Sequence, residues 1–189
     1  MQRILVLGGG FAGLWSAVGA ARELDELGIG PERVEVMLIN RTPWHSIRVR
    51  NYEADLQPTI VPLAKVLDPI AVRHLEAEVT DIDCVGRTVA CSSGGASQFL
   101  SYDRLVFALG SRLVRPDIPG LAECAFDVDT YEGGERLNEH IVALPLRPPS
   151  PGRFTVLVVG GGLTGIEAAT EMPAKLRAAI ASLTPALSQ

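Results

Sequence analysis

The sequence has few cysteines and no pattern of them that would bind a metal or form a disulfide framework. Its 189 residues include three, Cys84, Cys91 and Cys124, and no two form a Cys-x-x-Cys pair. An odd number of scattered cysteines favours a reducing compartment, here the cytoplasm, over a secreted protein. We therefore expect these residues to be packing residues or surface thiols, and we assign no metal ligands.

Basic residues are also scarce relative to acidic ones. Lys and Arg total 17 against 22 Asp and Glu, which gives a net charge of −5, and the basic residues form no long block. A nucleic-acid-binding protein needs a basic stripe that neutralises phosphates, so nucleic acid is not an expected partner. No apolar run approaches the roughly 18 residues of a membrane-spanning helix. Hydrophobic residues nevertheless make up 47% of the chain, enough for a buried core.

The first 40 residues alternate between strand-like and helix-like patterns. A short apolar run at Ile4–Leu7 predicts a buried parallel strand. Apolar residues at helical spacing predict a helix over Ala12–Leu27 that ends at Gly28, and Val34–Ile39 predicts a second strand. The N-terminal segment also resembles a secretory leader, but its three consecutive glycines fit a strand-to-helix turn better. The sequence thus predicts a βαβ unit.

The middle of the chain is less regular. Thr42–Pro62 predicts irregular structure or one short helix, and Leu63–Leu67 predicts a helical turn or two. The alternating pattern of Glu78–Cys91 predicts a small antiparallel hairpin or meander. After a loop at Ser92–Ser97, the apolar run Arg104–Leu109 predicts a strand that returns to the parallel sheet.

The last third repeats the opening pattern after a break. A helix is predicted over Tyr131–Leu144, and the four prolines of Pro145–Gly152 predict a linker. A strand at Phe154–Val159 and a helix over Ile166–Ala181 then follow, separated by a glycine turn. Pro173 is expected to kink this helix or to shift its start.

Two glycine motifs of identical spacing begin 152 residues apart, namely Gly8-x-Gly10-x-x-Gly13 and Gly160-x-Gly162-x-x-Gly165. Between a strand and a helix, the first glycine permits a tight turn, the second lets a pyrophosphate approach, and the third lets helix and strand pack closely. The helix N-terminus offers unpaired N–H groups and the positive end of the dipole. An ordinary glycine-rich turn is the alternative for either copy. Two copies predict two dinucleotides, and adjacent flavin and nicotinamide predict hydride transfer.

Four stretches carry a resemblance to a known family: VLGGGFAG, YDRLVFALGSRLVRPDIPG, VLVVGGGLTGIEAATE and the meander between the first two. Over residues 1–172 the chain resembles the FAD- and NAD(P)-dependent pyridine nucleotide-disulfide oxidoreductase superfamily. It is most similar to the type II NADH dehydrogenase branch, because the superfamily's Cys-x-x-x-x-Cys redox motif is missing. The resemblance implies an α/β Rossmann-like FAD/NAD(P)-binding fold with a parallel sheet, helices on both faces and a small antiparallel β-meander.

The resemblance also implies a domain plan and a function. It places the N-terminal part of an FAD-binding domain at 1–144, a Pro-rich linker at 145–152 and the truncated start of an NAD(P)-binding domain at 153–189. The implied activity is that of an FAD-dependent NAD(P)H oxidoreductase, which passes hydride from nicotinamide to flavin and on to a quinone or another small-molecule acceptor. The alternative is a catalytically inactive dinucleotide-binding module. A homodimer in which two incomplete chains complement one another is a third interpretation.

Residues for both cofactors follow from the same resemblance. The expected FAD-binding residues are Gly8, Gly10, Phe11, Ala12, Gly13, Asn40, Arg41, Val79, Ala108 and Gly110. The expected NAD(P)H-binding residues are Gly160, Gly162, Gly165 and Glu167. No catalytic residue is assigned.

Four of these residues have a more specific expected role. Asn40 stands where the family usually has Glu or Asp bound to the adenosine ribose, and an amide lacks the charge-assisted pairing of a carboxylate. The resemblance then implies weaker or differently oriented FAD binding, or help from Arg41. The backbone of Val79 is expected to meet the adenine. Glu167 has two interpretations: it lies near the nicotinamide, or it is a carboxylate that stabilises the N-terminus of its helix.

A polar cluster follows the second predicted strand and consists of His45, Arg48, Arg50, Tyr52 and Glu53. In proteins of the family this region faces the flavin. One arginine there could bind the FAD phosphates, which a guanidinium suits well. For most of the cluster, a solvated polar loop is the competing interpretation.

Overall fold

The computed structural model describes residues 1–182, and the chain forms two compact units. The first consists of Met1–Ile47 and Ile60–Ser111, and the second of Arg48–Thr59 and Arg112–Gln189. This division reflects which residues contact one another, whereas the expected domains at 1–144 and 153–189 concern cofactor binding. Those boundaries stay a prediction.

A four-stranded parallel sheet forms the centre of the first unit. Its order is β5-β2-β1-β9, and its strands are β1 (Gln2–Leu7), β2 (Val34–Asn40), β5 (Arg73–Glu76) and β9 (Arg104–Phe107). β1 pairs in parallel with both β2 and β9, while β2 also pairs with β5. The two central strands are the apolar runs of the sequence, because a parallel strand covered on both faces buries successive side chains. The predicted βαβ unit is confirmed.

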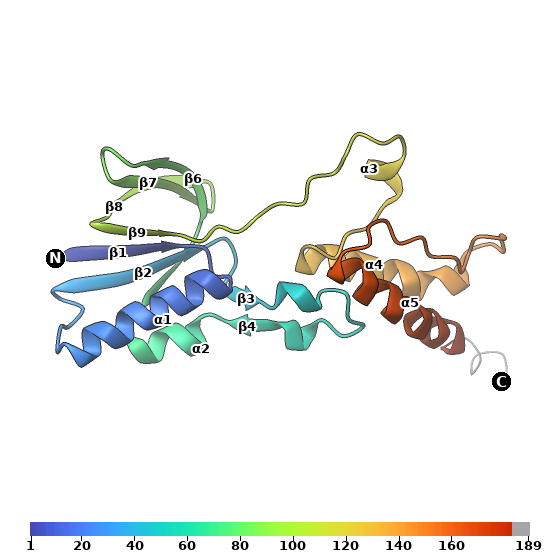
Figure 1. Ribbon diagram of the computed structural model, residues 1–189, viewed down its shortest axis with the longest axis horizontal. Coiled ribbons are helices and arrows are strands. Elements are labelled where there is room, and N and C mark those ends of the chain that lie inside the picture. The colour runs from blue at the N-terminus through green and yellow to red at the C-terminus, as the bar shows by residue number, and fades with distance from the viewer. Residues whose placement is uncertain (183–189) are drawn as a thin grey trace. The chain divides into compact units, whose positions relative to one another are not determined.

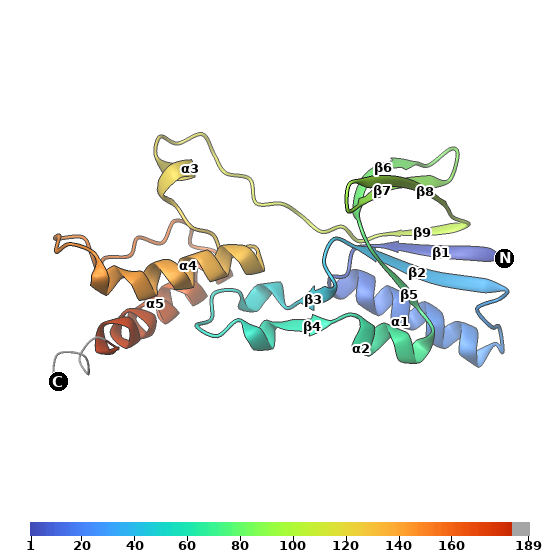
Figure 2. The same ribbon diagram turned by 180° about the vertical axis from the view of Figure 1, so that it is seen from behind.

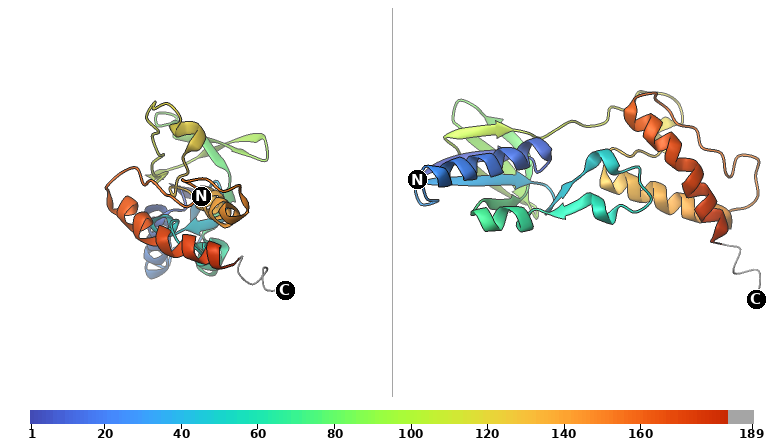
Figure 3. Two further views of the ribbon diagram at one scale, coloured as in Figure 1. Left: turned by 90° about the vertical axis from the view of Figure 1, so that its right-hand side faces the viewer. Right: turned by 60° about the horizontal axis from the view of Figure 1, so that its bottom comes forward.

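Different structures cover the two faces of this sheet (Figures 1 and 2). The helices α1 (Phe11–Glu26) and α2 (Ala64–Leu67) pack on one face through a shared cluster of buried residues. The right-hand view of Figure 3 shows α1 lying along the strands. An antiparallel meander of β6 (Glu78–Asp83), β7 (Thr88–Ser93) and β8 (Ala96–Ser101) packs on the other face.

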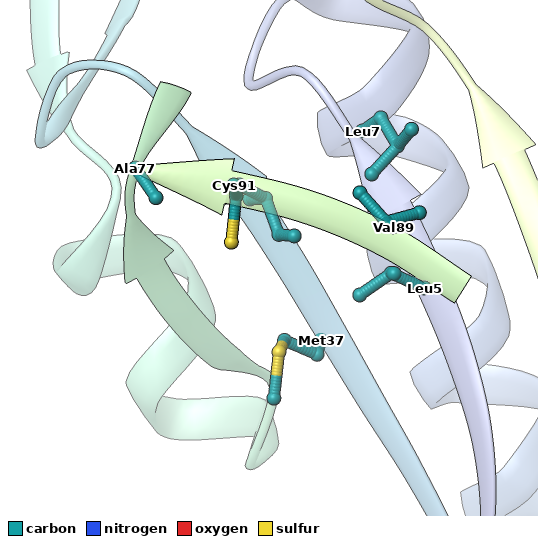
Figure 4. Packing of buried hydrophobic residues seen from close by; sticks show 7 residues of the cluster. Leu5, Leu7, Met37, Ala77, Val89 and Cys91 are labelled. Carbon is teal, nitrogen blue, oxygen red and sulfur yellow. The ribbon is translucent and has the colours of Figure 1, made fainter. Parts of the chain in front are cut away.

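Figure 4 shows the core under the meander. Val89 and Cys91 of β7 face Leu5 of β1 and Met37 of β2 in one buried cluster. The α/β fold class is confirmed, but helices were expected on both faces. Within the described part of the first unit they cover one face, because the apolar side of the meander fills the other.

Two strands of the first unit differ from the sequence-based expectation. The loop expected at Ser92–Ser97 is a two-residue turn at Gly94 and Gly95, whose φ angles are 55° and 84°. Two adjacent residues with positive φ form the tight hairpin that joins β7 to β8. Strand β5 was not predicted, because an edge strand of sequence Arg-His-Leu-Glu has no apolar run.

The segment expected to be irregular or to hold one short helix contains a strand pair. β3 (Trp44–Ser46) pairs in antiparallel with β4 (Ile60–Pro62). Between and around the longer elements, residues 1–182 form four single-turn 3₁₀ helices, at Arg48–Arg50, Gln57–Thr59, Asp68–Ile70 and Leu144–Leu146.

The second unit is built on two helices that lie side by side (Figures 1 and 2), preceded by the short helix α3 (Leu121–Cys124). In α4 (Tyr131–Ala143), the Thr130 hydroxyl caps the N-terminus by accepting the Gly133 N–H at 3.0 Å. Ile141 of α4 packs against Met172 and Ala179 of α5 (Leu163–Ala181). The unit is thus held by a small apolar contact between two helices.

The strand expected at Phe154–Val159 is wrong. Residues 155–159 belong to no helix or strand, and the side chains of Val156, Leu157 and Val159 are exposed. A parallel strand needs neighbours for its backbone N–H and C=O groups, and the described residues of this unit form no strand beside it. Helix α5 begins at Leu163, three residues before the expected start, and continues through Pro173.

Candidate functional site

The first glycine turn joins β1 to α1 at the carboxyl edge of the sheet. Gly8 has a φ of +102°, and a Cβ placed on it would lie 2.2 Å from the backbone oxygen of Ala108. A Cβ on Gly13 would lie 1.8 Å from the backbone oxygen of Gly8. Both positions therefore require glycine, the first for its backbone angle and close contact and the second for the helix–strand contact.

Gly10, the N-cap residue of α1, has the opposite environment. A Cβ on Gly10 would meet no described atom within 4 Å, and its backbone is extended. No side chain caps the helix, and its first turn contains no acidic residue. The N–H groups of residues 10–13 have no acceptor among the residues that the structure describes. These donors and the positive end of the helix dipole form an open site for an anion, with Phe11 and Ala12 exposed beside it.

Asn40, at the end of β2, is bonded to the turn itself. Its Oδ1 accepts the Gly9 N–H at 2.8 Å, and its Nδ2 donates to the backbone oxygens of Thr42 at 2.9 Å and Trp44 at 3.2 Å. These hydrogen bonds use both ends of the amide within the protein. The ribose contact expected of Asn40 stays a prediction, and so does the help expected of its exposed neighbour Arg41.

His45 is an exception to the solvated loop that was the competing interpretation for most of the polar cluster. It lies on β3 with 5% of its surface exposed, and its Nδ1 is 2.8 Å from the backbone oxygen of Gly9. The Phe11 ring meets its imidazole edge-on, with 4.6 Å between the ring centroids. Sequence reasoning missed this contact because nothing in the spacing of the cluster points back to the turn.

The remaining expected FAD-binding residues follow the carboxyl ends of neighbouring strands. Ala108 comes directly after β9 and donates its N–H to the backbone oxygen of Leu7 at 2.9 Å. Gly110 has a φ of +76° where the chain leaves the sheet. Val79 lies at the start of β6, beside an irregularity in the pairing with β7. The structure thus brings the glycine turn and the end of β9 together, as the two close contacts around Gly8 and Ala108 show.

The second glycine turn, in the second unit, repeats the backbone conformation of the first. Gly160 has a φ of +113°, and a Cβ on Gly165 would lie 2.1 Å from the backbone oxygen of Gly160. Gly162 caps α5 with extended backbone, and a Cβ there would meet no described atom within 4 Å. The same open helix N-terminus therefore occurs twice in the chain.

The two interpretations of Glu167 are affected by where α5 begins. With the helix starting at Leu163, Glu167 falls outside the first turn, which contains no acidic residue. The effect of the helix dipole declines within the first turn, so the stabilising interpretation loses most of its expected energy. The helix start expected at Ile166, which would put Glu167 in the first turn, is wrong, and the role of Glu167 near the nicotinamide stays a prediction.

The other members of the polar cluster lie in the second unit. Arg48 forms an ion pair with Asp129 and donates to its backbone oxygen at 2.9 Å. Arg50 is paired with Glu53, and this hydrogen bond holds the pKa of the Glu53 carboxyl below its usual value. Burial raises the pKa of the Tyr52 phenol. A phosphate contact by either arginine stays a prediction.

The described residues include no helix long and apolar enough to span a membrane. Cys91 is buried in the core while Cys84 and Cys124 are exposed, and all three are free, which confirms that they are a packing residue and two surface thiols. The part of the chain that the structure describes also has no group of three or more His, Cys, Asp or Glu side chains that could hold a metal ion.

Comparison with known proteins decides the family. The model of the pyridine nucleotide-disulphide oxidoreductase family matches residues 2–183. The chain belongs to this family. An NADH dehydrogenase-like protein of Mycobacterium tuberculosis is 54% identical over 181 residues, which are 96% of this chain and 44% of that protein. The type II NADH:quinone oxidoreductase of Staphylococcus haemolyticus is 28% identical over 185 residues, again 44% of its length.

A solved structure shares the fold. NDH2 from Plasmodium falciparum, determined in complex with NADH, superposes with a TM-score of 0.73 at 19% identity, covering 93% of this chain and 37% of that one. At this identity the likeness concerns the fold alone. The chain spans 44% of the length of the two curated relatives named above.

Proposed function

We propose that the first unit binds FAD and that the second glycine turn binds the pyrophosphate of NAD(P)H, as parts of an FAD-dependent NAD(P)H oxidoreductase. One observation carries this proposal. The same turn geometry occurs twice, each time with a glycine at the helix N-cap beside open space. Relatives named for NADH dehydrogenase and NADH:quinone oxidoreductase activity support it.

The residues around the first turn fit a dinucleotide. The space at Gly10 admits a pyrophosphate, and the N–H groups of residues 10–13 are donors for its oxygens. The exposed Arg41 adds a cation close to this edge of the sheet. Bound FAD would supply a ring that accepts hydride from nicotinamide and passes electrons to an acceptor, for which we propose a quinone.

Titration of the chain with FAD tests the first part of the proposal. We expect binding of one FAD per chain, measured by calorimetry, and a loss of at least about tenfold in affinity in Gly10→Ala, whose methyl group occupies the space for the pyrophosphate. Gly19→Ala is the matched control, because Gly19 lies on the exposed side of the same helix and its Cβ would also meet nothing described. Equal affinities in both variants would contradict the assignment.

A second candidate is a dinucleotide-binding module without electron transfer. The observation that favours it is the use of both ends of the Asn40 amide inside the protein, which leaves a ribose without its expected partner. Addition of NADH to the FAD-loaded chain separates the two. Bleaching of the flavin absorption supports the oxidoreductase, whereas binding of both nucleotides without bleaching supports the module.

A further inference from the structure

Two side chains, one at the end of β2 and one on β3, hold the Gly9 residue of the first turn from both sides. The Oδ1 of Asn40 accepts the Gly9 N–H, and the Nδ1 of His45 lies 2.8 Å from the Gly9 oxygen. Because a carbonyl oxygen only accepts, this contact requires a proton on Nδ1 of His45. The Asn40–His45 pair thus satisfies both backbone groups of one residue.

Glycine at position 9 makes this arrangement possible. A Cβ there would lie 2.8 Å from the Cγ of Asn40 and 3.0 Å from a methyl carbon of Leu63. The middle glycine of the triplet, which the motif itself does not specify, is therefore required by its neighbours. This requirement distinguishes Gly9 from Gly10, whose Cβ would point into open space.

The two hydrogen bonds fix two consecutive peptide planes. The described chain has no cis peptide, and in a planar trans peptide the C=O and N–H groups point in opposite directions. Holding the Gly9 N–H directs the Gly8 oxygen toward α1, which agrees with its close approach to Gly13. Holding the Gly9 oxygen directs the Gly10 N–H away from His45. That N–H is the first of the unpaired donors at the helix N-terminus.

His45 is itself held in place. It is paired with Val61 across β3 and β4, and the ring of Phe11 packs against its imidazole. Asn40 also binds the backbone oxygen of Trp44, the residue just before His45. The pair is therefore one connected arrangement held by the protein's own contacts, and preorganised donors cost less to engage than flexible ones.

We propose that His45, together with Asn40, is a positioning residue for the dinucleotide: it fixes the Gly9–Gly10 peptide so that the Gly10 N–H faces the phosphate. This inference rests on the proposed function of the first unit. The second turn lacks this support, since no described residue bonds to the backbone of Gly161, the counterpart of Gly9. The positioning by two side chains is therefore a feature of the first turn.

Two variants of His45 with the same shape test the proposal. In His45→Asn, the amide nitrogen is the same number of bonds from Cα as Nδ1 and can donate to Gly9, whereas His45→Leu has no donor. We expect the FAD dissociation constant, measured by flavin fluorescence, to stay within about threefold in the first and to rise about tenfold in the second. Equal affinity in the two variants would overturn the proposal, provided that tryptophan fluorescence shows both folded.

Readouts without FAD keep the test decisive. In the wild-type chain, the ¹⁵N shifts of the His45 ring should show a proton on Nδ1, and the amide shift of Gly10 should change in His45→Leu but not in His45→Asn. A deprotonated Nδ1, or an unmoved Gly10 amide, contradicts the inference. If His45→Leu does not fold, the ring nitrogen and the affinity of His45→Asn decide. A wild-type chain that fails to bind FAD contradicts the proposed function, while the ring and amide shifts still report on the peptide.

Discussion

The two glycine turns have one backbone conformation and two different surroundings. The φ angles of Gly8 and Gly160 are +102° and +113°, and both turns lead into a helix from a glycine with extended backbone. A Cβ on Gly8 would strike the oxygen of Ala108 in the neighbouring strand connection, whereas a Cβ on Gly160 would meet no described atom within 4 Å. The local sequence thus determines the turn, whereas the structure packed around the turn depends on other parts of the chain.

The strands before the turns show the same contrast. β1 pairs with two strands and buries Leu5 completely, while residues 155–159 have equally apolar side chains and leave Leu157 86% exposed. An apolar run becomes a strand when partners satisfy its backbone groups. Glycine spacing therefore determines a turn and a helix start, whereas a sheet requires partners from elsewhere in the chain.

The largest expected effect on stability distinguishes Gly8 from Gly160, the first glycines of the two turns. Gly8→Ala combines strain at positive φ with a clash against a backbone oxygen, and we expect it to destabilise the first unit by about 4 kcal/mol or more. Gly160→Ala meets strain alone, about 1–2 kcal/mol, confined to the start of α5. Both tryptophans, Trp15 and Trp44, lie in the first unit, so urea unfolding followed by tryptophan fluorescence measures the first effect.

Hydrogen exchange at the first amides of α5 measures the second effect. The Gly160→Ala variant should leave the fluorescence midpoint of the first unit unchanged. Equal shifts of that midpoint in the two variants would break the comparison.

A smaller effect is expected from the matched leucines. Leu5→Ala removes a completely buried side chain and should cost about 3 kcal/mol, from the lost burial and the cavity left behind. Leu157→Ala, in the corresponding position before the second turn, should cost less than about 0.5 kcal/mol, because its side chain is exposed. Urea unfolding followed by circular dichroism measures both. A loss of more than about 1 kcal/mol of unfolding free energy in Leu157→Ala would show that residues 155–159 are packed in solution.

The smallest effect concerns how the helix after each turn is packed. Helix α1 buries apolar residues such as Ala17, whereas α5 buries Lys175, whose Nζ donates to Oδ1 of Asn138 at 2.7 Å. Burial lowers the pKa of Lys175, and the nearby charges of Glu171 and Glu53 offset part of this shift. The unfolded state then binds the proton more tightly, so the stability of the second unit should rise as the pH increases toward the usual lysine value of 10.5.

Comparison of two lysine variants isolates this contribution. Lys175→Met should remove that part of the alkaline rise in stability, while Lys65→Met, at an exposed position on α2, should keep it. Other groups titrate in both variants, so the difference between their pH profiles of urea unfolding reports on Lys175. Identical profiles would contradict the burial of its charge.

The sequence predicted those parts of the molecule whose cause is local. The β1–α1–β2 unit and both glycine turns follow from apolar runs and glycine spacing, and they are present with small shifts in their ends. The edge strand β5 was missed because it is polar and its pairing with β2 comes from tertiary contact. The strand at Phe154–Val159 was predicted from the repeat of the opening pattern, and this segment lacks strand partners within the described residues.

The candidate site shows the same limit. The open glycines Gly10 and Gly162 were identified from spacing alone. The bonds of Asn40 and His45 to Gly9 were not, since the residues are more than 30 positions apart from it and meet through the sheet and the β3–β4 pair. A motif specifies the backbone that it contains, whereas the side chains that hold this backbone come from distant parts of the sequence.

Hydrogen exchange of the whole chain with and without FAD measures whether the first turn is built into a sheet and ready to hold a dinucleotide. We predict strong protection at Ile4–Leu7, rapid exchange at residues 155–159, and new protection on adding FAD at residues 10–13 but not at residues 162–165. Equal protection of the two apolar runs, or no FAD-dependent change at residues 10–13, would contradict the account.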